Sequence, residues 1–277
     1  MPFNDKDDTE ISDLNNDGTL AIDNLSQLIV LVPIYRPNLD ELERFSLDVS
    51  FSMLSERDIR FIGPNGLDLT LYAESFPSIP FIGFDDASFA SIPDYNRLLL
   101  SQDFYRQFAE YEFMLILQTD AIVLRDELNY WCAQPFDYIG APWPDGYELF
   151  VNLGLFEGVY GKRVKVQVGN GGLSLRRISK CISLLNEFDI AISVFSHTGS
   201  SEDLFFSVMG ALSGDFIIPN EITASRFALE LKPSYYVAVN GGKLPMGGHA
   251  WWKHEPEFWR KLLVNAPLPI TQDIQSP

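Results

Sequence analysis

The sequence predicts an α/β fold with a mostly parallel central sheet and helices on both of its faces. Two continuous apolar runs, Leu28–Val32 and Phe113–Leu117, are typical of strands buried on both sides of a sheet. Over the first half of the chain, such runs alternate with segments whose apolar residues have helical spacing, which favours parallel strands joined by helices. The 277 residues are enough for one large domain of this class.

In the first half, residues that interrupt the pattern set the element ends. The strand over 28–32 stops at Pro33, and the apolar positions of 40–54 predict a helix. A second strand, 60–63, ends at Pro64–Gly66, and 81–84 is a third. A helix over 94–110 then leads into the strand 113–117.

The second half is less regular. A loop rich in Gly, Pro and Trp is expected over 140–146, and a strand or turn over 166–175. We expect a helix over 179–195, a short strand over 216–219 and a last helix over 255–263. No repeat or linker divides the chain, so residues 27–277 are predicted to form one Rossmann-like domain.

An acidic, partly disordered arm is expected over residues 1–26. Within it, Asp13–Leu20 matches the front half of a calcium-binding loop. Asn24 stands where such a loop has a bidentate glutamate, so an Asn-Asp-Gly turn is the favoured interpretation.

Composition argues against several classes of partner. A formal net charge of −18, from 38 acidic and 20 basic residues, would repel nucleic acid and anionic membranes. The 2 cysteines form no disulfide framework and favour a reducing compartment. The start of the chain lacks the features of a signal peptide, and the apolar run 28–34 is too short to cross a bilayer. We therefore expect no transmembrane segment and a cytoplasmic location.

The first motif that could carry chemistry is Gln118–Asp120, which follows the strand 113–117. In open α/β sheets, ligands bind at the carboxyl ends of the strands. A carboxylate there can hold a divalent ion that bridges the phosphates of a nucleotide diphosphate. The alternative is that Asp120 merely ends the strand or caps the next element.

Two further motifs have equally plain alternatives. The glycines around Asn170 allow a ligand to approach the backbone, and Arg176 could meet a phosphate, although a Gly-rich turn would have the same sequence. Glu202 and Asp203 could take the proton of an acceptor hydroxyl. They could equally begin a helix, capped by a preceding serine and facing the helix dipole.

The fourth motif surrounds His249, one of 3 histidines, in a Gly-rich segment beside Trp251 and Trp252. Imidazole is a good ligand for manganese or zinc, and the indole faces could stack on a sugar or a base. The alternative is a Gly-rich loop whose aromatic side chains close the core.

In their order and rough spacing, these motifs resemble glycosyltransferases of the GT-A fold, of which the β-1,4-galactosyltransferases are the nearest well-known type. The chain also looks like a bacterial family of glycosyltransferase-like proteins. This closer resemblance runs from about Val30 to Trp252 and is carried by Pro33–Arg36, Tyr95–Leu99, Phe104–Tyr105, Leu117–Asp120, Asp137–Trp143, Gly169–Arg176, Glu202–Asp203 and Arg226–Glu230.

The resemblance implies a hexosyltransferase that moves a sugar, with inversion, from a nucleotide-diphosphate sugar to a hydroxyl of a carbohydrate or other acceptor, a UDP-sugar being favoured. Asp203 would be the catalytic base, assisted by Glu202. The donor would be bound by Pro33, Tyr35, Arg36, Asn96, Gln118, Thr119, Asp120, Asn170, Gly171, Gly172 and Arg176. The acceptor would be bound by Trp143, Glu202 and Trp251, and a metal by Asp120 and His249.

The sequence departs from the family at Gln118, which occupies the first position of the Asp-x-Asp motif. Dependence on manganese or magnesium is therefore left open, and a cation such as Arg176 could replace part of the metal's charge. One alternative function is a non-catalytic protein that binds nucleotide sugars or carbohydrates on the same fold. Another is a nucleotidyltransferase, although Pro33–Pro37 lacks the Gly-rich triphosphate loop expected there.

Overall fold

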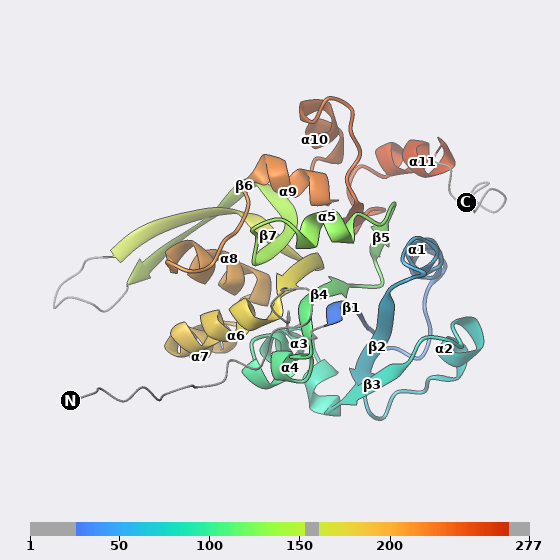
Figure 1. Cartoon of the computed structure of the whole chain (residues 1–277), viewed down its shortest axis with the longest axis horizontal. Coiled ribbons are helices and arrows are strands. Elements are labelled where there is room, and N and C mark those ends of the chain that lie inside the picture. Colours follow the sequence, from blue (N-terminus) through green and yellow to red (C-terminus); the bar gives the residue numbers. More distant parts are fainter. Residues whose placement is uncertain (1–25, 153–160, 266–277) are drawn as a thin grey trace, which may run out of the picture.

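A computed structural model describes residues 26–152 and 161–265, which fold around a six-stranded sheet (Figure 1). The strand order is β3-β2-β1-β4-β7-β6. The strands are β1 (Ser26–Pro33), β2 (Asp58–Pro64), β3 (Phe81–Phe84), β4 (Tyr111–Leu117), β6 (Tyr138–Asn152) and β7 (Gly161–Arg177). The first four run parallel, whereas β7 and β6 are antiparallel to their neighbours. The α/β prediction is confirmed, with the parallel part of the sheet in the first half of the chain.

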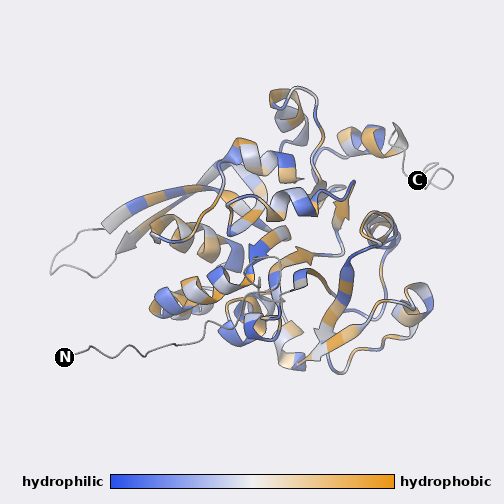
Figure 2. Cartoon of the chain, viewed as in Figure 1, coloured by the Kyte–Doolittle hydropathy of each residue, from blue (hydrophilic) through white to orange (hydrophobic). Residues whose placement is uncertain are grey.

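Helices cover both faces of this sheet because its strands bury side chains in both directions. Val30 and Val32 of β1 face one core, and Ile29 and Leu31 face the other. The first core is closed by α1 (Glu41–Met53), α2 (Thr70–Ser75), α5 (Leu128–Cys132) and α9 (Glu221–Phe227). The second is closed by α3 (Ile92–Leu99), α4 (Gln102–Arg106), α6 (Ile178–Glu187), α7 (Asp189–Thr198) and α8 (Glu202–Leu212). These helices carry both hydrophobic and hydrophilic residues (Figure 2).

A second, three-stranded sheet lies beyond the carboxyl end of β4. Its order is β5-β9-β8, formed by β5 (Ala121–Val123), β9 (Gly247–His249) and β8 (Ala228–Leu229). A third apolar cluster, which includes Ile122, Tyr236 and Trp259, joins this sheet to α10 (Pro233–Val239) and α11 (Pro256–Asn265). The small sheet therefore brings three distant segments of the chain to one place.

The structure corrects four predicted elements. The helix expected over 94–110 is two helices, because Ser101 caps a new one at α4. The helix expected over 179–195 is likewise divided, at Phe188. The loop expected over 140–146 belongs to β6, where shifts in register accommodate its Pro and Gly residues. Residues 216–219 form no strand, although Ile217 exchanges hydrogen bonds with Asp137.

Residues 1–25 of the predicted acidic arm, including its Asp13–Leu20 motif, lie outside the described residues, whereas Ser26 already belongs to β1. Within residues 26–152 and 161–265, no helix combines the length and apolar character needed to cross a bilayer.

Candidate functional site

The small sheet assembles a charged cluster at the carboxyl end of β4. Asp120 directly precedes β5, Glu230 directly follows β8, and His249 is the last residue of β9. The pairing of β5 with β9 places Ala121 opposite His249, which brings Asp120 to the imidazole. Lys253 completes the cluster from the turn after β9. We call Asp120, Glu230, His249 and Lys253 the charged cluster.

Opposite charges alternate within the charged cluster. The Oδ1 atom of Asp120 lies 3.1 Å from Nε2 of His249, and its Oδ2 accepts a hydrogen bond of 2.8 Å from Nζ of Lys253. Nδ1 of His249 lies 3.5 Å from Oε1 of Glu230. Burial alone would raise the pKa of Asp120, but His249 and Lys253 hold it well below its usual range. Burial likewise opposes the charge on His249, yet the two carboxylates raise the pKa of its imidazole to about 9.

The glycine-rich part of β7 lies against this cluster. The side-chain amide of Asn170 donates a hydrogen bond to Glu230, and its carbonyl accepts one of 3.1 Å from the backbone N–H of Gly172. A Cβ atom on Gly172 would come within 2.2 Å of the His249 ring. Glycine is therefore required for this close approach.

Asp203 lies on the other side of the same backbone, in the first turn of α8. Its Oδ2 accepts a hydrogen bond of 3.1 Å from the N–H of Gly171. Burial raises the pKa of the Asp203 carboxyl, against the hydrogen bonds that it accepts. The structure thus brings the predicted base next to the predicted donor residues Asn170 and Gly171.

Glu202 and Arg176 have a different place from the one predicted. The guanidinium of Arg176 is fully buried and donates to Glu202 at 2.9 Å, to Tyr105 at 2.9 Å and to Ser174 at 3.1 Å. It also lies 5.1 Å from the centre of the Tyr138 ring. Both side chains are enclosed between β7 and α8, where a ligand does not reach them. We therefore assign Arg176 no role in donor binding or in replacing the charge of a metal, and Glu202 no role in acceptor binding or catalysis.

The two predicted acceptor tryptophans are also buried. Trp143 is 6% exposed and packs edge to face on Tyr147. Trp251 is 6% exposed, and its indole N–H donates to Ser46 at 2.9 Å within the third apolar cluster. Little of either ring is free to stack on a sugar, so we do not retain these two assignments.

The first predicted donor segment follows β1. Pro33 is buried, whereas Tyr35 is 57% exposed and Arg36 is also exposed. Arg36 is held by Glu43 at 2.5 Å, and Thr119 donates to the same carboxylate at 2.7 Å. Asn96 lies half-buried on α3 and makes none of these contacts.

Sequence reasoning missed Glu43, Glu230 and Lys253. Glu43 belongs to a capping box with Asp40, and this local role fully accounts for its sequence pattern. Glu230 ends the Arg226–Glu230 segment of the family resemblance, which was the one available signal. No local pattern marked Lys253.

Asp120 and His249 fit a two-residue metal site. Their facing atoms are 3.1 Å apart, close to the separation of roughly 3 Å expected for adjacent ligands with bonds of about 2.1 Å. Neither ring nitrogen of His249 has a hydrogen-bond partner within the described residues. In the part of the chain that the structure describes, no group of three or more His, Cys, Asp and Glu side chains is arranged to hold a metal. Further ligands would have to come from a bound diphosphate or water.

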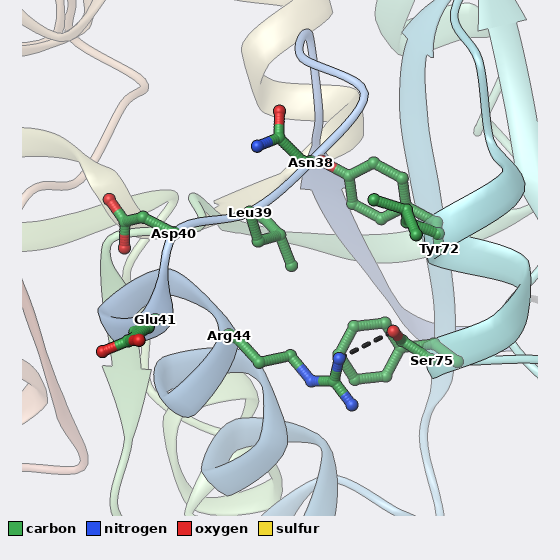
Figure 3. Close-up of a pocket in the computed structure, with 9 residues that line it drawn as sticks. Asn38, Leu39, Asp40, Glu41, Arg44, Tyr72 and Ser75 are labelled. Carbon is green, nitrogen blue, oxygen red and sulfur yellow. Dashed lines mark hydrogen bonds between the residues drawn. The ribbon is translucent and has the colours of Figure 1, made fainter.

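Two cavities in the described part of the chain are lined by none of the predicted site residues. One, of about 240 Å³, separates the segment after β1 from α2 and is lined by Asn38, Asp40 and Tyr72 among others (Figure 3). The hydroxyl of Tyr72 donates to the carbonyl of Arg36, which connects this cavity to the first donor segment. The other, of about 700 Å³, lies between β7, α8 and residues 216–222.

The mixed α/β fold, with its six-stranded central sheet and helices, matches that of GT-A glycosyltransferases. The structure is similar to that of the galactosyltransferase LgtC in complex with donor and acceptor sugar analogs, at 14% identity and a TM-score of 0.50, over 88% of this chain and 98% of that one. A mouse xyloside xylosyltransferase 1 in its apo form is similar at 9% identity and a TM-score of 0.48, over 81% of this chain and 97% of that one. Residues 78–249 match the model of a family described as a protein of unknown function (DUF5672), and the chain belongs to this family. The comparison with curated protein sequences found no match.

Proposed function

We propose that this protein is a glycosyltransferase that moves a sugar from a nucleotide-diphosphate sugar to an acceptor hydroxyl. The observation that carries the proposal is the arrangement around Gly171 and Gly172. On one side of this backbone lies the charged cluster, and on the other lies the carboxylate of Asp203. A donor bound across the glycines would have its diphosphate at the first group and its anomeric carbon near the second.

The charged cluster supports binding of a diphosphate. Lys253 is exposed and offers a cation at the edge of the sheet. In the absence of a metal, the two carboxylates favour a protonated His249, which adds a second positive charge. A divalent ion such as manganese or magnesium would instead be held by Asp120 and the neutral imidazole of His249, after its proton is released. When bound, it would neutralise the charge that develops on the departing diphosphate. We retain UDP as the favoured nucleotide, on the family resemblance.

Asp203 supports the second half of the reaction. Its carboxylate would accept the proton of the acceptor hydroxyl while that oxygen attacks the anomeric carbon from the side opposite the diphosphate. The bond to the diphosphate breaks as the new glycosidic bond forms, so a single displacement inverts the anomeric configuration. A pKa raised by burial suits a base that works near neutral pH.

One observation favours a second candidate, a binding protein without catalysis. Gln118 leaves only one carboxylate in the Asp-x-Asp position, and both oxygens of Asp120 already contact cations of the chain. Such a protein would bind a nucleotide sugar without consuming it. The cytoplasmic location and the bacterial source stay predictions from the sequence.

Turnover of donor sugars separates the two candidates. We expect the wild-type protein, incubated with UDP-, GDP-, TDP- and CMP-sugars and a panel of saccharide acceptors, to release one class of nucleotide. Asp203→Asn should reduce this release by roughly 10²–10⁴-fold, because the variant cannot accept the proton. NMR of the product gives its anomeric configuration.

The matched control is Asp103→Asn, which removes a carboxylate that is 82% exposed on α4. It should keep wild-type turnover. An Asp203→Asn variant with unchanged turnover would remove Asp203 from the mechanism, and a retained configuration would exclude the single displacement. Binding of a nucleotide sugar with no turnover on any acceptor would favour the binding protein.

A further inference from the structure

A buried carboxylate, that of Glu43, joins two donor segments that lie far apart in the sequence. Its side chain is 6% exposed. Oε1 accepts a hydrogen bond of 2.7 Å from the hydroxyl of Thr119 and one of 2.5 Å from the guanidinium of Arg36. Glu43 thus connects the segment after β1 with the segment after β4.

The other contacts of Arg36 leave its loop little freedom. Its carbonyl accepts a hydrogen bond of 2.9 Å from the hydroxyl of Tyr72, and its guanidinium lies 5.3 Å from the centre of the exposed Tyr35 ring. Both the backbone and the head group of Arg36 are therefore held, and its half-exposed side chain is presented beside Tyr35.

We infer that Glu43 is a positioning residue for nucleotide binding, which sets Arg36 and the Gln118–Asp120 segment relative to each other. The inference rests on the proposed function, because it takes both segments as donor-binding. One carboxylate can hold both segments because its Oε1 accepts from Arg36 of the segment after β1 and from Thr119 of the segment after β4. Losing it would leave Arg36 with no fixed direction and Thr119 with no buried acceptor.

A purely structural role is the competing explanation. Glu43 also closes the capping box of α1, where Oε2 accepts a hydrogen bond of 3.0 Å from the N–H of Asp40. Glutamine serves equally well at this position of a capping box. Glu43→Gln therefore keeps the cap and removes the charge that holds Arg36, which separates the two roles.

The test measures nucleotide affinity by calorimetry in a double-mutant cycle. The variants are Glu43→Gln, Arg36→Gln and the double variant, titrated with whichever of UDP, GDP, TDP and CMP the wild-type protein binds. We expect each single variant to raise Kd roughly tenfold, which corresponds to about 1.4 kcal/mol. The double variant should be no more than about twice as weak as Arg36→Gln, because both substitutions break one interaction.

Two further measurements guard against a general loss of stability. Donor KM should rise in Glu43→Gln while kcat and Tm stay near the wild-type values. The matched control is Glu41→Gln, an exposed acid in the same first turn of α1, which should leave Kd unchanged.

An unchanged Kd in Glu43→Gln, additive losses in the double variant, or a loss of affinity that follows a lowered Tm would each overturn the inference while leaving the proposed function intact. A wild-type protein that binds none of the four nucleotides would remove the proposed function, and this inference with it.

Discussion

At the scale of single residues, burial separates the side chains that can meet a ligand from those that hold the site together. Asp120 and Asp203 are partly exposed, whereas Arg176 and Glu202 are enclosed in the second core. The adjacent acids Glu202 and Asp203 therefore have different roles, although the sequence presents them as a pair. Glu202 fixes the start of α8 to β7 through Arg176, and Asp203 is left facing Gly171.

This division predicts a large loss of stability on truncating Glu202. Glu202→Ala leaves the guanidinium of Arg176 buried without its carboxylate, which should lower the free energy of unfolding by about 3–5 kcal/mol. Urea denaturation measures the change. The control is Glu148→Ala, which breaks the exposed pair with Arg163 and should cost about 0–1 kcal/mol. A loss below 1 kcal/mol for Glu202→Ala would show that the buried pair does not hold α8 in place.

At the scale of elements, β7 is the part of the fold that connects both halves of the proposed reaction. It pairs with β4 on one side and β6 on the other, and its central glycines approach His249 and Asp203. The backbone N–H of Gln118 also donates to the carbonyl of Gly172 at 2.9 Å. Small changes in the path of this strand should therefore affect the site more than the fold.

Gly172→Ala tests that expectation. The added Cβ would meet the His249 ring at 2.2 Å, so the ring or the strand must shift, which disturbs the contact between His249 and Asp120. We expect a loss of stability of about 1–3 kcal/mol, together with weaker nucleotide binding in calorimetry. Gly214→Ala, where no atom lies within 4 Å of the added Cβ, should change neither. Wild-type affinity in Gly172→Ala would mean that the position of His249 does not matter for the donor.

Local patterns predicted the four parallel strands and the longer helices, but not the strands of the small sheet or short helices such as α2, α5 and α9. The strands at β1 and β4 were found because their apolar runs are continuous. The break between α3 and α4 was missed because the apolar spacing continues through the cap at Ser101. Strand β6 was missed because its Pro and Gly residues are absorbed by register shifts that only pairing with β7 creates.

The candidate site was predictable only in part, for the same reason. A strand end identified Asp120, Gly-rich segments identified Asn170 and His249, and an acid pair identified Asp203; the structure places Asn170, Asp203 and His249 around Gly171 and Gly172, with Asp120 against His249. The role of Glu43 depends on its contact with Thr119, 76 positions away in the sequence. The indole N–H of Trp251 likewise bonds to Ser46, 205 positions earlier, and no local sequence pattern can predict either contact.

At the scale of the whole molecule, the two sheets have complementary roles. The large sheet delivers the segments after β1 and β4 to one edge, as open α/β sheets do for ligands. The small sheet adds Glu230, His249 and Lys253 from the last third of the described chain. Because the chain has a net charge of −18, an anionic ligand needs local donors, and His249 and Lys253 are the two that the charged cluster supplies.

The most direct test of the donor site is the stability of the wild-type protein in urea with each nucleotide diphosphate, with and without manganese. We predict that one nucleotide, at about one hundred times its Kd, raises the free energy of unfolding by roughly 2.7 kcal/mol. If Asp120 and His249 hold a metal, manganese should enlarge this increase. Unchanged stability with every nucleotide, in the presence and absence of manganese, would contradict a nucleotide-sugar donor site in this protein.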